Sequence, residues 1–281
     1  MNNFFFTTCQ VGAEKALKAE IAREHPHYHA SYSRPGFVTF KVMAGALTGD
    51  FMLRSVFART YAVSVGKVDG TSPDFAAQAI KMVTEAGAAF PMHLHVYEID
   101  EYTPGDEPPG YVEGVKAKHV FTEILTEAPE KFHLETHAAP DDWVMDIVVV
   151  SEKELWIGVH KHHEGHLTAV GGKFPVTADP NAPSRAYDKF EEAIQATGLE
   201  FREGQFVVEL GSAPGGISYG LLKRGMNVCG VNPANVNENI LAFRQQYMHV
   251  WKKAVEVKRE ELPEQIDWIV LDVNDRPEQV L

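Results

Sequence analysis

The chain has 281 residues, of which 44% are hydrophobic and 23% are charged. These proportions are close to those of soluble globular proteins, so the disordered, collagenous and coiled-coil classes are excluded. The 26 Lys and Arg residues against 39 Asp and Glu residues give a net charge of −13. This charge argues against a broadly basic nucleic-acid surface but leaves room for a local basic groove. At about 100–200 residues per domain, the length predicts two or three domains.

The two cysteines, Cys9 and Cys229, lie far apart in the sequence. They cannot form a secreted disulfide framework or a four-cysteine zinc site, and they are typical of a protein in a reducing cytosol. No apolar run approaches the length of about 20 residues that crosses a bilayer, and the apolar start lacks the basic region of a signal peptide. We therefore expect a soluble, cytoplasmic protein with no membrane partner.

The elements expected before residue 170 mix helices with alternating strands, an α+β pattern. Strands are predicted at 4–8, 60–68, 92–97, 141–150 and 154–160, with a hairpin at 32–42 whose second arm is 37–41. Helices are predicted at 13–23, 74–86 and 115–127, and a loop at 103–110. No catalytic constellation stands out in this part of the chain.

A linker at 171–183 holds three prolines, and after it strands and helices alternate. The expected helices are 184–197, 217–224 and 237–247, and the expected strands are 205–210, 227–231 and 267–271. Such alternation predicts a parallel, doubly wound sheet with its ligand at the carboxyl ends of the strands.

The strongest motif is Val207-Val-Glu-Leu-Gly-Ser-Ala-Pro-Gly-Gly216. A buried strand ends in an acidic residue, and the chain then turns over small residues into a helix. Because glycine has no Cβ, a ligand can lie against the main chain of this loop. The loop matches neither the Gly-x-Gly-x-x-Gly nor the Walker pattern of nucleotide sites. A tight turn packed by glycines is the structural alternative.

This loop resembles the S-adenosylmethionine loop of methyltransferases, in the form found in the FtsJ-type group that methylates ribose 2′-hydroxyls. Upstream, Ala182-Pro-Ser-Arg-Ala-Tyr-Asp-Lys189 resembles the helix that carries the first catalytic lysine of that group. The resemblance implies S-adenosylmethionine as cofactor and Lys189 and Asp272 as catalytic residues. The cofactor-binding residues that it implies are Glu209, Gly211, Ser212, Ala213, Pro214, Gly215, Gly216, Asn232 and Asp272.

The segment from Asp267 to Val280 narrows the resemblance to one family, the bacterial 23S rRNA ribose 2′-O-methyltransferase M. The strand that begins here delivers Asp272 to its carboxyl end, the ligand side of such a sheet. Segments around Cys9–Lys15, Phe57–Arg59 and Lys173–Arg185 also resemble that family, so the similarity covers essentially the whole chain. It implies an α/β protein with a ferredoxin-like region at 1–70, a THUMP-like RNA-binding domain at 71–170 and a Rossmann-like FtsJ-type domain at 171–281. The implied substrate is RNA, by the family ribosomal RNA, and not DNA.

The chemistry suits these residue types, because a ribose hydroxyl must lose its proton as it attacks the methyl group. A lysine can act as the base only if its pKa falls from the usual value of about 10.4. The family uses two lysines, an aspartate and a glutamate, and Lys189 and Asp272 match the first lysine and the aspartate. The other two would lie on strands beyond Leu281. We therefore expect an incomplete domain, with on the order of 70–100 further residues by the usual size of domains.

Two departures from the family pattern concern the cofactor. Asn232 stands where the family usually has the Asp that accepts hydrogen bonds from the ribose of the cofactor, and Val255 stands where it usually has the Asp near the adenine. An Asn carbonyl can still accept a hydrogen bond, but its amide competes as a donor and carries no charge. The alternative is therefore a non-catalytic RNA-binding THUMP protein whose methyltransferase domain is degenerate.

Two histidine clusters, at 25–29 and 160–166, need a separate interpretation. Histidine is a common ligand of zinc and nickel, but no cysteine or ordered carboxylate spacing supports a metal here. We expect no metal, and a solvated or RNA-facing loop at 160–166. The basic pairs Lys223-Arg224, Lys252-Lys253 and Lys258-Arg259 are expected on a solvated face, where few phosphate contacts with steep salt dependence could form.

Overall fold

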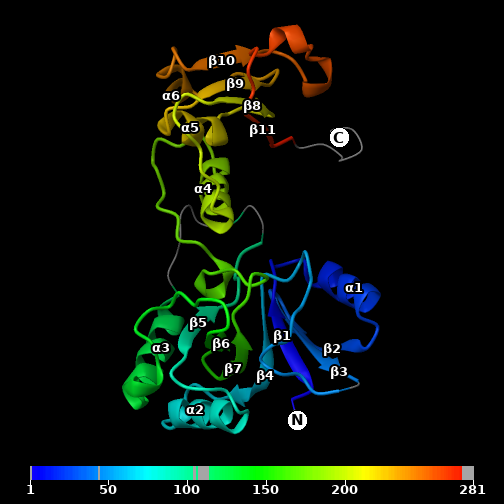
Figure 1. Cartoon of the computed structure of the whole chain (residues 1–281), viewed down its shortest axis with the longest axis vertical. Coiled ribbons are helices and arrows are strands. Elements are labelled where there is room, and N and C mark those ends of the chain that lie inside the picture. The colour runs from blue at the N-terminus through cyan, green and yellow to red at the C-terminus, as the bar shows by residue number, and fades with distance from the viewer. Residues whose placement is uncertain (1, 44, 104–105, 107–113, 274–281) are drawn as a thin grey trace. The chain divides into compact units, whose positions relative to one another are not determined.

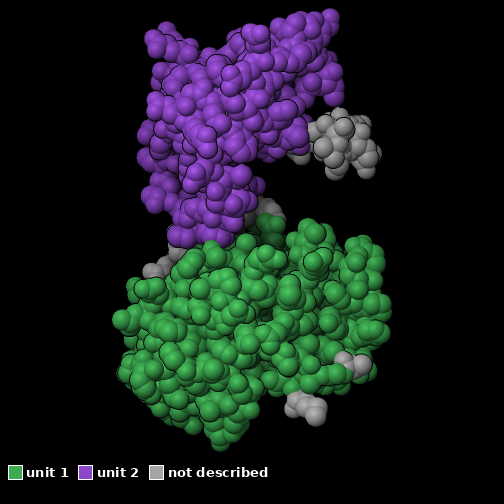
Figure 2. Space-filling model, in the orientation of Figure 1, with its two compact units in different colours: residues 1–108, 112–173 green, residues 109–111, 174–281 purple. Residues whose placement is uncertain are grey.

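The computed structural model describes residues 2–43, 45–103, 106 and 114–273. The chain divides into two compact units, Met1–Pro108 with Val112–Lys173, and Pro109–Tyr111 with Phe174–Leu281 (Figure 2). Each unit has its own sheet and its own hydrophobic core. The division after Lys173 falls inside the linker predicted at 171–183.

The first unit is built on a seven-stranded sheet in the order β2-β3-β1-β4-β7-β6-β5 (Figure 1). Neighbouring strands pair antiparallel except β5 and β6, which are parallel. The strands are β1 (Phe4–Thr8), β2 (Tyr28–Arg34), β3 (Phe37–Val42), β4 (Thr60–Val68), β5 (His93–Glu98), β6 (Trp143–Ser151) and β7 (Glu154–Lys161). The strands predicted in this region are confirmed.

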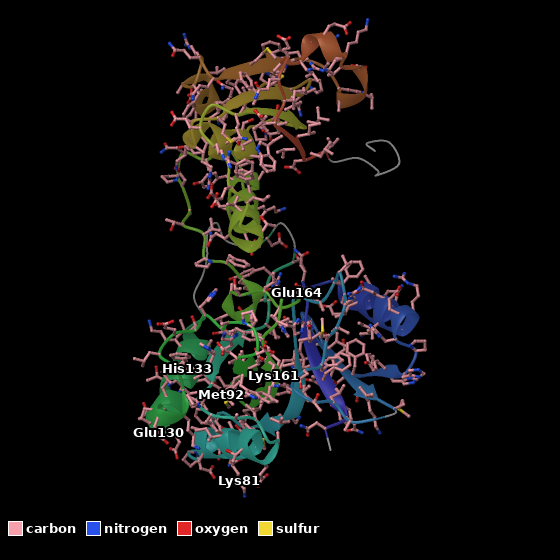
Figure 3. The ribbon with its side chains drawn as sticks, viewed as in Figure 1. Lys81, Met92, Glu130, His133, Lys161 and Glu164 are labelled. Carbon is pink, nitrogen blue, oxygen red and sulfur yellow. The ribbon has the colours of Figure 1, made fainter. Side chains whose placement is uncertain are left out.

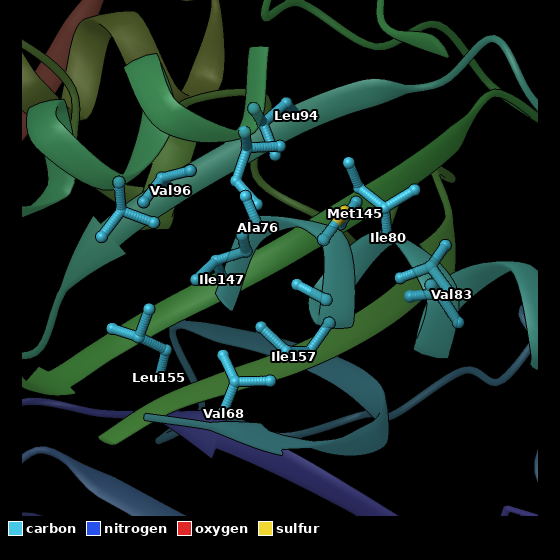
Figure 4. Close-up of a cluster of buried hydrophobic side chains, with 14 of the residues drawn as sticks. Val68, Ala76, Ile80, Val83, Leu94, Val96, Met145, Ile147, Leu155 and Ile157 are labelled. Atoms are coloured by element: carbon cyan, nitrogen blue, oxygen red, sulfur yellow. The ribbon is translucent and has the colours of Figure 1, made fainter. Parts of the chain in front are cut away.

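Three helices cover this sheet, and each was predicted. They are α1 (Glu14–Glu24), α2 (Phe75–Glu85) and α3 (Val115–Glu127), with short 3₁₀ turns η1 (Pro129–Lys131) and η2 (Val170–Gly172). Helix α2 buries Ala76, Ile80 and Val83 at helical spacing against β5, β6 and β7 (Figure 4). Burial of a side chain of the size of Ile80 or Val83 contributes about 1.5–3 kcal/mol. None of the helices in the described residues is long and apolar enough to span a membrane.

The strands on both sides of the domain boundary expected near residue 70 belong to one sheet. The helices that pack on this sheet form two separate hydrophobic cores. Helix α1 packs on the sheet through Leu17 and Ile21, which belong to one buried cluster with Phe5 of β1 and Phe40 of β3. The second core lies between α2, α3 and strands β4 to β7. The ferredoxin-like and THUMP-like assignments stay predictions. The loop expected at 103–110 lies largely outside the described residues.

The second unit contains a four-stranded sheet in the order β10-β9-β8-β11, and all of its described pairings are parallel. The strands are β8 (Phe206–Leu210), β9 (Asn227–Val231), β10 (Tyr247–Val250) and β11 (Trp268–Leu271). The helices are α4 (Ala186–Thr197), α5 (Gly216–Lys223) and α6 (Glu238–Leu241), with 3₁₀ turns η3 (Ala254–Glu256) and η4 (Arg259–Glu261). The parallel sheet predicted after the linker is confirmed.

The helix predicted at 237–247 is wrong beyond its first turn. Helix α6 covers only Glu238–Leu241, where the Asn237 side chain accepts a hydrogen bond from the Asn239 N–H. From Tyr247 the chain forms strand β10, which pairs in parallel with β9. Local spacing does not reveal this strand, because it depends on an available neighbour in the sheet.

Candidate active site

The carboxyl ends of the four parallel strands lie along one edge of the second unit's sheet. Leu210 of β8 pairs with Val231 of β9 and with Leu271 of β11, and Val231 pairs with Val250 of β10. In parallel α/β sheets, ligands bind at this edge. The residues that follow the four strands, and that therefore meet here, are Gly211, Asn232, Trp251 and Asp272.

Gly211 makes the approach of the loop to Asp272 possible. Its φ of +93° is a conformation that side chains other than glycine rarely adopt, and a Cβ at this position would lie 2.1 Å from the main-chain oxygen of Asp272. The Asp272 N–H donates to the carbonyl of Leu210 over 3.0 Å. The Asp272 side chain is exposed. The structure thus brings two predicted site residues, far apart in sequence, into contact.

Gly215 and Gly216 serve the packing of the chain on itself. A Cβ on Gly215 would lie 2.6 Å from the Ile240 side chain, and one on Gly216 would lie 2.4 Å from the Ser184 hydroxyl oxygen. For these two positions the alternative interpretation, a turn packed by glycines, therefore applies. Ser184 belongs to the segment that contains Lys189, so the two motifs of the sequence lie side by side. Pro214, which follows a cis peptide bond, accepts a hydrogen bond from the Asn237 N–H at its carbonyl.

Lys189 lies on the exposed face of α4. The opposite face of this helix buries Tyr187 and Phe190 against α5, and a Cβ on Gly220 would lie 2.8 Å from the Phe190 ring. Lys189 follows the residues that contact Gly216 by about one helical turn. The contact between Gly216 and the start of α4 therefore fixes the helix that carries this lysine.

Glu209 is buried beneath the loop. Its side chain is 1% exposed, and its carboxylate accepts a hydrogen bond from the Ser218 hydroxyl at the start of α5. Burial raises the pKa of Glu209 to about 8, and the negative charge of Asp272 adds to the effect. Glu209 was predicted among the cofactor contacts. Its burial and its hydrogen bond to Ser218 suit it instead to hold the loop against α5.

Asn232 has its carbonyl oxygen engaged within its own turn. Oδ1 accepts from the Ala234 N–H over 2.8 Å, and the Asn232 main-chain oxygen accepts from His249 Nε2 over 2.9 Å. The side-chain oxygen that we expected to accept a hydrogen bond from the cofactor is therefore already bonded. The side-chain NH₂ group of Asn232 remains available as a donor. Ser212 is buried, with no hydrogen-bond partner for its hydroxyl among the described residues. Val255 is 74% exposed in η3.

Trp251 is a candidate site residue that the sequence interpretation missed. It directly follows β10 at the ligand edge, and its side chain is 64% exposed. Its ring stacks on His249 with 4.1 Å between centroids, and its indole N–H donates to Asn235 Oδ1 over 3.4 Å. An exposed, orientated aromatic ring at this edge can stack on a flat base. The sequence signal was a tryptophan directly after a strand. This signal could be used only if strand β10 had been predicted.

Four side chains of the three basic pairs in the second unit are bonded to carboxylates or to main-chain carbonyls. Lys223 lies 2.7 Å from an oxygen of Asp179, and Lys252 lies 2.6 Å from an oxygen of Glu261. Arg224 donates to both oxygens of Glu191, and the guanidinium of Arg259 donates to the carbonyls of Pro263 and Glu264. Phosphate contacts from these pairs would therefore compete with existing bonds.

The histidine segment at 160–166, in the first unit, is not the solvated loop that we predicted. His160 and His162 are 5% and 4% exposed. His160 lies one residue before the end of β7, on the face of the sheet opposite α2, and the loop after Lys161 folds back over it. That prediction is therefore wrong for this segment, whereas His27 and His29 of the other cluster are exposed.

Comparison with known proteins finds a family similar to the unit that carries the motifs. Residues 182–279 match the family of FtsJ-like methyltransferases. The matched residues make up most of the second unit, so this unit is similar to FtsJ-like methyltransferases. The match spans the glycine loop, the helix with Lys189 and the strand that ends before Asp272, so the resemblance inferred from these motifs is confirmed.

The similarity to individual proteins extends beyond the FtsJ-like domain. The chain is 27% identical to the "Ribosomal RNA large subunit methyltransferase M" of Teredinibacter turnerae, over 97% of this chain and 78% of that protein. It is also 27% identical to the protein of the same name from Sodalis glossinidius, over 100% of this chain and 78% of that protein. A solved structure described as a possible methylase from Clostridium difficile is 12% identical, covers 99% of this chain and 82% of that chain, and has a TM-score of 0.36, too low to bear on the assignment.

Proposed function

We propose that this chain is an S-adenosylmethionine-dependent methyltransferase that acts on a ribose 2′-hydroxyl of RNA, with large-subunit ribosomal RNA as the substrate. The observation that supports the proposal is the position of the matched family residues in the fold. The FtsJ-like match covers the sheet edge where Gly211, Trp251 and Asp272 meet. The names of the full-length relatives supply the ribosomal substrate.

The proposed domain organisation follows the same resemblance. The first unit would combine the ferredoxin-like and THUMP-like regions that contact RNA, and the second unit would be the Rossmann-like catalytic domain. The reaction is assigned to the cytoplasm, where the two cysteines, both free and buried, would stay reduced. Burial raises the pKa of Cys9 to about 12 and that of Cys229 to about 11, so neither is a reactive thiolate.

The residues at the sheet edge fit the groups of S-adenosylmethionine. The exposed Trp251 ring offers a stacking surface for the adenine, and the amide of Asn232 can donate to a ribose hydroxyl. The exposed Asp272 carboxylate adds negative charge near the bound cation, and Gly211 lets the loop lie against the main chain of Asp272. When bound, S-adenosylmethionine supplies an electrophilic methyl group to the substrate.

Lys189 would act on the substrate hydroxyl. Bound S-adenosylmethionine would supply the methyl group and leave as the thioether, and Nζ of Lys189 would accept the proton that the substrate 2′-hydroxyl loses. The exposure of Lys189 leaves its amine accessible to RNA. Asp272 would orient the lysine and stabilise the ammonium that forms.

A calorimetric titration of the natural polypeptide with S-adenosylmethionine tests the proposal. We expect one binding event per chain, weakened by Asp272→Asn and unchanged by Asp50→Asn, a carboxylate of the first unit. The absence of heat at millimolar cofactor would contradict the proposal and favour the alternative of a non-catalytic RNA-binding protein.

A further inference from the structure

Three histidines gather at the end of β7 in the first unit (Figure 3, where Lys161 and Glu164 mark the strand end and the following loop). One ring nitrogen from each of His160, His162 and His166 lies within 4.8 Å of the others. His160 and His162 are buried, and His166 is half-buried. The rings of His160 and His166 stack with 4.0 Å between centroids. A strand end and a loop that folds back thus bring together side chains up to six positions apart.

The nitrogens of this cluster lack partners. His160 Nε2, His162 Nδ1 and both ring nitrogens of His166 are buried without a hydrogen bond to any described residue. Buried polar atoms in folded proteins normally have a hydrogen-bond partner, so four unpaired nitrogens in one place require an explanation. A neutral imidazole offers a lone pair at one ring nitrogen, which is the form that binds metal ions.

A buried carboxylate orients one of the rings. Asp146 is 3% exposed, and its Oδ2 accepts a hydrogen bond of 2.5 Å from Nδ1 of His160. Its other oxygen accepts from the Tyr97 hydroxyl over 3.2 Å. Because Nδ1 carries the proton, the lone pair of His160 is on Nε2, the atom that has no partner. A carboxylate that holds the far nitrogen of a histidine is the usual support of a metal ligand.

The neighbouring histidine is excluded as a ligand by its bonds. Nδ1 of His163 accepts from the Gly165 N–H, and its Nε2 therefore donates to the Tyr61 hydroxyl, each over 2.9 Å. Beside the three ligands is a cavity of about 40 Å³, lined in part by His95, Asp146, His160 and His166. A cavity of this volume holds at least one water molecule, so it has room for a further small ligand.

We propose that His160, His162 and His166 bind a single divalent transition-metal ion, Zn²⁺ in the cell, with a fourth coordination position open to this cavity. Three neutral imidazoles with one open position are a recognised zinc ligand set. Tetrahedral zinc at about 2.0–2.1 Å from each nitrogen requires nitrogens about 3.4 Å apart. The ligands, now within 4.8 Å, would close on the ion by small side-chain rotations. The ion would tie the loop after Lys161 to the sheet. The proposal does not depend on the methyltransferase activity.

Metal binding to the full-length, tag-free protein tests this site. After removal of metal with a chelator, we expect titration with Co²⁺ to give visible d–d bands of a tetrahedral ion, to saturate at about one ion per chain, and to be reversed by Zn²⁺. X-ray absorption of the Zn²⁺ form should show three imidazole ligands. The absence of these bands, or fewer than three imidazoles, would overturn the proposal.

Variants distinguish metal binding by the histidines at 160–166 from metal binding by the exposed histidines at 25–29. Replacement of two ligands in the His160→Gln/His166→Gln variant should lower the affinity for Co²⁺ more than about 100-fold, whereas the matched variant His27→Gln/His29→Gln should bind as the natural protein does. Asp146→Asn should keep the stoichiometry and lose about 10–100-fold in affinity. If the ligand variant does not fold, the X-ray absorption result alone decides. Unchanged binding by a folded ligand variant would overturn the proposal.

Discussion

The main-chain oxygen of Asp272 lies where a side chain on Gly211 would begin, 2.1 Å from the position of a Cβ. Gly211 and Asp272, which are far apart in the sequence, therefore lie in contact at the ligand edge. This contact is possible because glycine has no Cβ. The glycine loop and the strand that ends before Asp272 act as one structural element.

Gly211→Ala should therefore weaken both the fold and cofactor binding. The positive φ alone costs about 1–3 kcal/mol for a residue with a Cβ, and displacement of Asp272 adds to this cost. Gly204→Ala is the matched control, because Gly204 has a φ of +81° and nothing within 4 Å of its Cβ position. Urea unfolding and cofactor titration measure the two effects. Equal losses in both variants would show that the contact with Asp272 contributes nothing.

Glu209 should make the second unit less stable as pH rises. The folded state holds the proton up to about pH 8, whereas the unfolded chain loses it near 4.5. The unfolded state thus binds fewer protons between these values, so the stability is full below about 4.5 and falls until about 8. At about 1.4 kcal/mol per pKa unit, the loss amounts to a few kcal/mol.

Glu209→Gln should remove this slope, because an amide oxygen can still accept the Ser218 hydrogen bond but cannot ionise. The measurement is the free energy of unfolding of both proteins from pH 4.5 to 8, and the difference between them isolates Glu209. Parallel curves would contradict the burial argument.

Trp251→Ala should weaken binding of S-adenosylmethionine if the indole stacks on the adenine. Base stacking on an aromatic ring is worth about 1–3 kcal/mol, so the dissociation constant should rise about 5–150-fold. Trp251→Phe retains a ring and should lose less. Trp251 is exposed, so both variants should unfold at the temperature of the natural protein. An affinity unchanged in Trp251→Ala would exclude stacking.

Lys189→Met should abolish methyl transfer while it leaves cofactor affinity nearly unchanged, because the lysine is assigned to the substrate hydroxyl. Lys258→Met, at another exposed lysine of the same unit, should retain activity. Steady-state kinetics and calorimetry on both variants provide the comparison. Parallel loss of activity and cofactor affinity would instead make Lys189 a structural residue.

Much of the fold could be predicted because it depends on local patterns. Helix α3 has the predicted bounds, 115–127, and strands β4 and β9 were also predicted to the residue. Strand β10 was missed because the residues from Tyr247 to Val250 become a strand only when β9 pairs with them. The same omission hid Trp251, whose position at the ligand edge depends on that pairing.

The prediction of a solvated loop at 160–166 was wrong for a related reason. His160 and His162 are two positions apart, but His166 joins them only because the loop reverses, and no local pattern encodes that reversal. At Asn232, residue type predicted a carbonyl acceptor, whereas the turn assigns that oxygen to the Ala234 N–H. Motifs identified the residues of the site, and only the folded backbone determined which of their atoms are available.

The measurement that tests the central claim most directly is the location of the transferred methyl group. Large-subunit ribosomal RNA that lacks the modification is incubated with the natural polypeptide and tritium-labelled S-adenosylmethionine, and the RNA is then digested to nucleosides. We expect the label in a single 2′-O-methylated nucleoside, with none when the Lys189→Met variant is used. Label on a base, or RNA that stays unlabelled although the protein binds the cofactor, would contradict assignment of the chain as a ribose 2′-O-methyltransferase.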